Sequence, residues 1–89
     1  MPKRTLPPDP EKTNTSRAKW AGAALRHFQS ITGSDHEDAL GDLLCDLMHW
    51  CDRKNYDFDL ALTRAQGNYE AETSAPPVYR SLQSATEGR

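Results

Sequence analysis

The chain has 89 residues and a mass of 10.0 kDa, which allows one small domain. Hydrophobic residues make up 36% of it and its mean hydropathy is −0.84, which excludes a protein packed along its whole length. No apolar run approaches the ~20 residues of a membrane span, so we expect no membrane partner. A core of this size is too small for an elaborate active-site cleft. The sequence therefore favours a compact binding module.

The net charge of −2 is unevenly distributed along the chain. Residues 15–33 carry three basic residues and no acidic one, whereas residues 34–74 carry ten acidic residues against three basic ones. An acidic surface of this kind repels a phosphate backbone. We therefore expect a protein partner with a basic surface and no direct contact with nucleic acid.

The two cysteines are predicted to be reduced. Cys45 and Cys51 are six residues apart in one helical pattern. This separation is about 9 Å along a helix axis, too far for a disulfide. Because no signal-peptide pattern opens the chain either, we expect a cytoplasmic protein.

Both ends of the chain are predicted to lack regular structure. Residues 1–14 contain four prolines, and residues 75–89 contain two more. Proline interrupts helices and sheets, so we interpret these segments as a disordered arm and a disordered tail. They flank a predicted domain of residues 15–74.

The domain is predicted to be all-α, a small three-helix bundle. The helices are expected at about residues 16–32, 35–54 and 58–73, separated by short connections that make consecutive helices neighbours. The first and third helices have inner faces on which apolar side chains recur at helical spacing. These faces consist of Ala18, Ala21, Ala24, Leu25, Phe28 and Ile31, and of Phe58, Ala61, Leu62, Ala65 and Tyr69.

Local motifs mark where the predicted helices begin and end. Thr15 or Ser16 is the expected N-cap of the first helix, and Gly33 its C-cap. Ser34 and Glu37 have the spacing of a capping box at the start of the second helix. Asn55 is expected to end that helix in a left-handed conformation, and Asp57 is the expected N-cap of the third.

The second helix has two contrasting faces. Its apolar residues cover an arc of about 160°, more than one neighbouring helix needs. A narrower stripe lies opposite and repeats carboxylates at successive turns. It consists of Asp35, Asp38, Asp42, Asp46, His49 and Arg53. Two interpretations remain open: a solvated acidic face, or a surface that binds a protein.

The candidate partner-binding residues combine this stripe with apolar side chains near it. Trp50 and Met48 lie at the two edges of the apolar arc, where they are either the boundary of the core or the apolar centre of an interface with a charged rim. Tyr56 lies in the following turn, and Leu60 points away from the predicted inner face. The full candidate set is Asp38, Asp42, Asp46, Met48, His49, Trp50, Tyr56 and Leu60.

No catalytic residue, metal site or cofactor is predicted. Cys45 and His49 are four residues apart, but tetrahedral zinc needs four ligands and neither a CxxC nor an HxxxH spacing occurs. The chain contains no GxSxG nucleophile motif, and its glycines are isolated from one another. We therefore expect a protein that is not an enzyme.

One resemblance offers an alternative. The segment EDALGDLLCDLMHWCDR, followed by NYDFDLALTRA, resembles the later half of MazG-type nucleoside triphosphate pyrophosphatases. The resemblance implies an all-helical enzyme in which Asp38 and Asp42 help to hold magnesium. Members of that family also have a glutamate pair on the preceding helix, whereas residues 15–33 contain neither Asp nor Glu. This departure removes half of the expected metal ligands.

A second resemblance suggests the principal hypothesis. The block from Ala39 to Glu72, with DLLCDLMHWCDR, DFDLAL and NYEAE, resembles the QseM-like antiactivators encoded on proteobacterial integrative and conjugative elements. It covers about the middle 40% of the chain. The resemblance implies a protein that binds transcriptional activators, namely a LuxR-type quorum-sensing regulator such as TraR and the FseA-type activator of excisionase expression. Inhibition of these activators would repress transfer of the element. For the free protein we expect a monomer or a weak homodimer.

Overall fold

The computed structural model describes residues 5–74, which form three helices. These are α1 (Asn14–Thr32), α2 (Ala39–Lys54) and α3 (Phe58–Glu72), and they make up about 71% of the described residues. No strand occurs between residues 5 and 74. The prediction of a small all-α bundle of three helices is confirmed. Residues 1–4 and 75–89, where disorder is predicted, lie outside the described residues.

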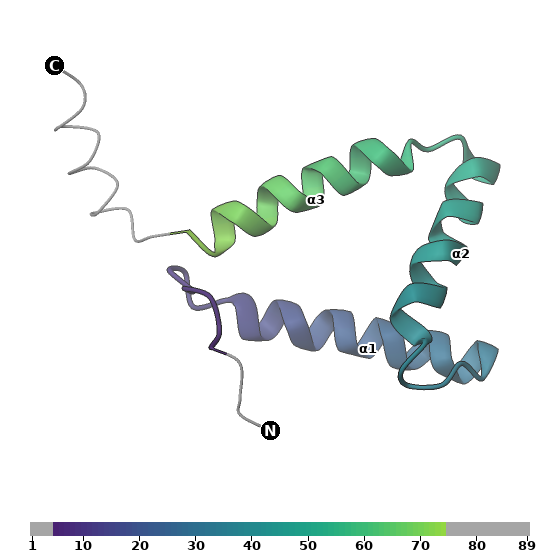
Figure 1. The fold of residues 1–89 in the computed structure, drawn as a ribbon, viewed down its shortest axis with the longest axis horizontal. Helices are drawn as coiled ribbons and strands as arrows, with labels where there is room; N and C mark the ends of the chain where they lie inside the picture. The colour runs from purple at the N-terminus through teal and green to yellow at the C-terminus, as the bar shows by residue number, and fades with distance from the viewer. Residues whose placement is uncertain (1–4, 75–89) are drawn as a thin grey trace, which may run out of the picture.

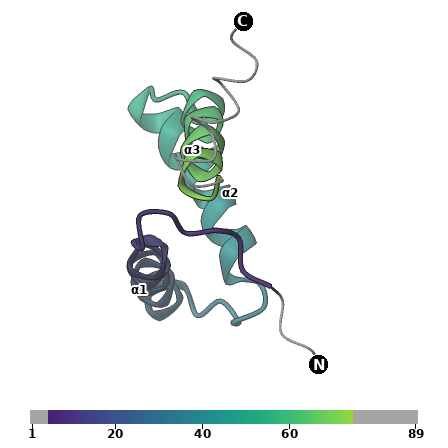
Figure 2. The same ribbon diagram turned by 90° about the vertical axis from the view of Figure 1, so that its left-hand side faces the viewer.

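The three helices lie along the sides of a triangle, as Figure 1 shows. α2 contacts α1 near its own start and α3 near its own end. Viewed along the perpendicular direction, α1 and α3 lie at two levels, and the segment before α1 runs between them (Figure 2). α2 therefore acts as a spacer between the other two helices. Within residues 5–74, no helix combines the length and apolar character needed to cross a membrane.

Three of the predicted helix ends are confirmed. Gly33 ends α1 with φ 75°, and its N–H donates to the carbonyl of Gln29. Asn55 ends α2 with φ 61° and ψ 40°, a left-handed conformation that asparagine tolerates better than most residues. At the start of α3 the Asp57 carboxylate accepts the N–H of Leu60 at 3.0 Å, the bond expected of an N-cap.

The predicted start of the second helix is wrong by four residues. α2 begins at Ala39, and residues 36–38 form a turn. The Ser34 hydroxyl donates to the Asp42 carboxylate at 2.7 Å, so the expected capping box with Glu37 does not form. Asp38 occupies the N-cap position, and its side chain makes no capping hydrogen bond.

The start of the first helix also differs from the prediction. α1 begins at Asn14 with Thr13 as its N-cap, rather than at Thr15 or Ser16. The Asp9 carboxylate accepts the N–H groups of Thr13 and Asn14 at 3.2 and 3.3 Å, which satisfies donors that the first turn leaves free. α1 therefore begins at the last residue of the segment predicted to be a disordered arm, residues 1–14.

Few side chains are buried in this arrangement. Ala39 and Cys51 are the two buried hydrophobic residues among residues 5–74. The predicted inner faces of the first and third helices are open instead, because α2 holds these helices apart: Ile31 is 70% exposed and Tyr69 is 58% exposed. The described domain thus presents apolar side chains along all three helices.

Candidate functional site

The acidic stripe, defined above as six residues, follows one exposed face of α2 and the loop before it. Asp38, Asp42 and Asp46 are spaced by four residues, so they lie at successive turns of the helix. All three are exposed. Asp42 accepts the Ser34 hydroxyl, and none of the three makes an ion pair with a residue that the structure describes. Their negative charge is therefore free to attract a basic surface.

The end of the stripe carries a local contact between His49 and Arg53. Arg53 donates from Nη1 to the His49 carbonyl at 3.2 Å, one turn back. The bond holds the Arg53 side chain against the helix, one turn before its end. The guanidinium charge stays at the carboxyl end of α2, where the helix dipole favours a cation. The stripe is thus acidic at its start and basic at its end.

Trp50 and Tyr56 form a stacked aromatic pair where α2 ends. Their ring centroids are 5.1 Å apart and their planes differ by 16°. The Tyr56 N–H donates to the Cys51 carbonyl at 2.9 Å, the long-range bond of a Schellman motif. Such motifs often bring the residue after the cap against the last turn, and the aromatic pair is that contact. Trp50 and Tyr56 are nevertheless 49% and 62% exposed.

The aromatic pair and the acidic stripe are adjacent. Trp50 follows Asp46 by four residues, so the two side chains are neighbours on the surface of α2. An exposed aromatic pair beside a row of carboxylates has the composition of a protein-binding surface with an apolar centre and a polar rim. We call the combination of Asp42, Asp46, Trp50 and Tyr56 the acidic–aromatic surface.

Two predicted site residues do not join this surface directly. Met48 is 50% exposed, but it lies roughly 120° around α2 from Asp42 and roughly 160° from Asp46, on the leucine-rich side. Leu60 is 46% exposed and lies in the first turn of α3, where its N–H is held by Asp57. The candidate set is therefore divided between at least two faces.

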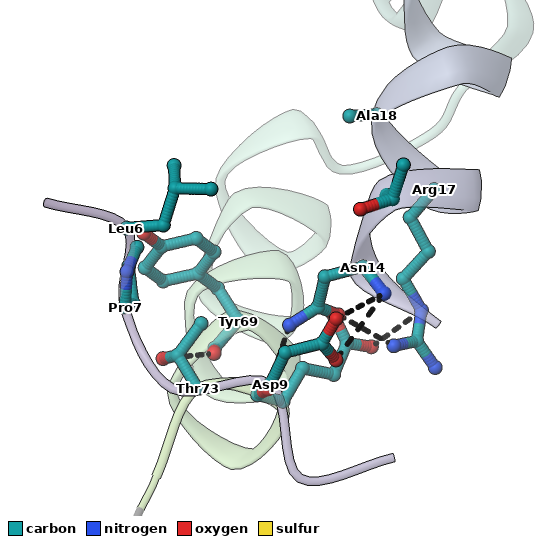
Figure 3. Close-up of a pocket in the computed structure, with 10 residues that line it drawn as sticks. Leu6, Pro7, Asp9, Asn14, Arg17, Ala18, Tyr69 and Thr73 are labelled. Carbon is teal, nitrogen blue, oxygen red and sulfur yellow. Dashed lines mark hydrogen bonds and ion pairs between the residues drawn. The ribbon is translucent and has the colours of Figure 1, made fainter. Parts of the chain in front are cut away.

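A hollow that the sequence did not predict lies at the corner of the triangle where α1 begins and α3 ends. It has a volume of about 390 Å³ and lies where the segment before α1 meets the start of α1 and the end of α3. Leu6 and Pro7 lie beside the ring of Tyr69, and a polar network closes the other side (Figure 3).

This network joins residues far apart in the chain. Asn14 donates from Nδ2 to the Glu72 carbonyl at 2.9 Å, and Arg17 donates to Asn14 Oδ1 at 2.7 Å. Arg17 also pairs with the carboxylates of Glu72 and Glu11, each at 3.5 Å. Sequence spacing could not reveal these contacts because Asn14 and Glu72 are 58 residues apart.

The residues suggested as magnesium ligands lie close together in sequence but belong to different environments. Asp38 is the N-cap of α2, while Asp42 lies one turn into the helix and accepts the Ser34 hydroxyl. Among the described residues, no group of three or more His, Cys, Asp or Glu side chains is arranged to hold a metal ion.

Comparison with known proteins adds no relative. No family model matches the chain, and neither a curated protein nor a solved structure is similar to it. The resemblances to QseM-like antiactivators and to MazG-type pyrophosphatases therefore stay predictions based on sequence segments.

Proposed function

We propose that this protein is a small non-enzymatic antiactivator that binds and inhibits transcriptional activators. Its expected targets are a LuxR/TraR-type quorum-sensing regulator and an FseA-type excision activator, and the expected outcome is repression of element transfer. The observation that supports this proposal best is the acidic–aromatic surface, where two exposed carboxylates lie beside a stacked and half-exposed aromatic pair.

The two parts of the surface have different roles in the proposal. The carboxylates of Asp42 and Asp46 attract a basic surface on the activator, such as one that contacts DNA, and so raise the association rate. Trp50 and Tyr56 supply a large apolar contact at little entropic expense, because each ring already restricts the other. Contact with a DNA-binding surface or with a dimer-forming surface would each inhibit an activator.

Binding kinetics with a purified LuxR/TraR-type activator test the proposal. Asp42→Asn combined with Asp46→Asn should leave the fold intact, because it removes repulsion between like charges one turn apart. It should lower the association rate severalfold and flatten the salt dependence of that rate. An FseA-type activator is measured in parallel.

A control variant removes the same amount of charge elsewhere. Asp52→Asn combined with Glu70→Gln changes two exposed carboxylates outside the acidic–aromatic surface and should leave the association rate close to that of the unaltered protein. Equal effects of the two double variants would show that net charge alone matters, which contradicts a local surface. Failure of the unaltered protein to bind either activator would overturn the proposal.

The enzymatic alternative is tested on the same material. A MazG-type pyrophosphatase would release pyrophosphate from nucleoside triphosphates with Mg²⁺, and Asp42→Ala would abolish the release. The antiactivator hypothesis expects no such release from the unaltered protein.

A further inference from the structure

A row of exposed leucines lies on the side of α2 away from the acidic stripe. Leu40, Leu44 and Leu47 are 61%, 43% and 39% exposed. Cys51 continues the row and is buried, with 8% exposure. The row therefore has one end in the small core and the rest on the exposed surface of α2. Because the described domain buries few side chains, exposure of this apolar row to water lowers its stability.

The spacing of this row is that of a helix-pairing seam. The successive intervals are four, three and four residues, which is the alternation of the two core positions in a coiled coil. Within the wider apolar arc of α2, residues with this spacing form a line that can pack against one other helix.

Charges at the two ends of α2 favour an antiparallel copy of the same helix. Glu37 and Asp38 lie at its start, and Arg53 and Lys54 form its last turn. In an antiparallel pair the start of one helix lies beside the end of the other, so acidic residues meet basic ones at both ends. A parallel pair would bring like charges together at each end.

One register satisfies the leucines and the charges together. Antiparallel core positions pair so that Leu44 lies level with Leu47 of the second copy. In this register, two residues from different copies lie at the same height along the pair when their numbers add up to the same total as 44 and 47. Leu40 lies level with Cys51, and Glu37 with Lys54 of the second copy. The apolar seam and the terminal charges therefore agree on one arrangement.

We propose that α2 packs antiparallel against α2 of a second copy of this chain, through Leu40, Leu44 and Leu47, with Glu37 facing Lys54 across the two-fold axis. The arrangement is isologous, so each contact at one end is repeated at the other. It uses the side of α2 opposite to Asp42 and Asp46. Whether the proposed function is correct does not affect this proposal.

Sedimentation of the purified full-length protein measures the association. The unaltered chain should approach twice its monomer mass of 10.0 kDa as its concentration rises. Leu44→Glu should weaken the association at least tenfold. Ile31→Glu is a matched control, because Ile31 is 70% exposed on α1 and lies outside the seam, and it should leave the association unchanged.

Charge reversal identifies the orientation even if Leu44→Glu disturbs the fold. Glu37→Lys and Lys54→Glu should each weaken self-association, because each places like charges at both ends of the pair. An equal mixture of the two variants should associate as well as the unaltered protein, since the mixed pair restores an opposite-charge contact at both ends. A monomer at every concentration, or a mixture no better than its components, would overturn the proposal.

Discussion

The Trp50 side chain packs at the end of its own helix and is also partly exposed to water. The ring stacks on Tyr56 at 5.1 Å as part of the helix end, yet 49% of Trp50 stays exposed. From the sequence it was equally compatible with the boundary of a core. The structure places it where it supports the end of α2 and leaves it half-exposed to solvent, so its contribution to stability should be modest.

Trp50→Ala should therefore affect binding more than folding. We expect the free energy of unfolding to fall by about 1–2 kcal/mol, since an aromatic pair contributes roughly 0.5–1.5 kcal/mol beyond the area that it buries. Binding to an activator should weaken by roughly 2 kcal/mol or more, as expected of an aromatic anchor. Thermal melts and binding isotherms on the same sample separate the two quantities.

Trp20→Ala is the matched control for this substitution. Trp20 is 66% exposed on α1, away from the acidic–aromatic surface, so its loss should leave activator binding unchanged. A loss of stability of about 3–5 kcal/mol in Trp50→Ala would instead indicate a core residue and contradict the exposed position described above.

At the scale of single helices, the ends were predictable where one residue determines the backbone. Gly33 and Asn55 adopt the left-handed conformation that ends α1 and α2, and Asp57 caps α3 through its own carboxylate. These are local effects that spacing and residue type reveal. The start of α2 was not predictable in this way, because Ser34 bonds to Asp42 eight residues later rather than to the backbone of the first turn.

The two aspartate N-caps should differ in their contribution to stability. Asp57→Ala removes a hydrogen bond to the N–H of Leu60 and should lower the free energy of unfolding by about 1 kcal/mol. For a domain of this size, that corresponds to a fall of roughly 4–8 °C in Tm. Asp38→Ala removes a carboxylate that makes no capping bond, so it should change Tm much less. Equal losses in the two variants would contradict the difference between these caps.

The candidate site was predictable in part for a related reason. Helical periodicity alone places Asp42 and Asp46 on one face and Trp50 next to them, and α2 is regular over this stretch. The stacking of Trp50 on Tyr56 depends on the turn after Asn55, and the exposure of Met48 depends on how α1 and α3 diverge from α2. Such relations between elements are not encoded in periodicity.

At the scale of the whole molecule, one polar network closes the triangle of helices. Asn14 and Arg17 at the start of α1 hold the main chain and the carboxylate of Glu72 at the end of α3. α2 separates α1 and α3 at the other end, so this network is the principal polar link between them in the described part of the chain. The angle between the two helices should thus depend on it.

Glu72→Gln tests the charged part of that link. The Arg17 and Glu72 side chains are 34% and 30% exposed, so water screens the ion pair and its loss should lower the free energy of unfolding by about 0.5 kcal/mol. The effect should shrink as salt is added, because ions screen the pair in the unaltered protein too. Urea melts at low and high salt measure both quantities.

Asn14→Ala tests the uncharged part and should be the larger change. It removes the side-chain donor to the Glu72 carbonyl and the acceptor for Arg17, so the free energy of unfolding should fall by about 1 kcal/mol at either salt concentration. Glu70→Gln is the control, since Glu70 lies on the same last turn of α3 and makes no ion pair with a described residue. Because a carboxylate at the end of a helix opposes the helix dipole, Glu70→Gln should not lower stability. Equal losses in Glu70→Gln and Glu72→Gln would therefore contradict a specific role of the Arg17–Glu72 ion pair in holding the triangle closed.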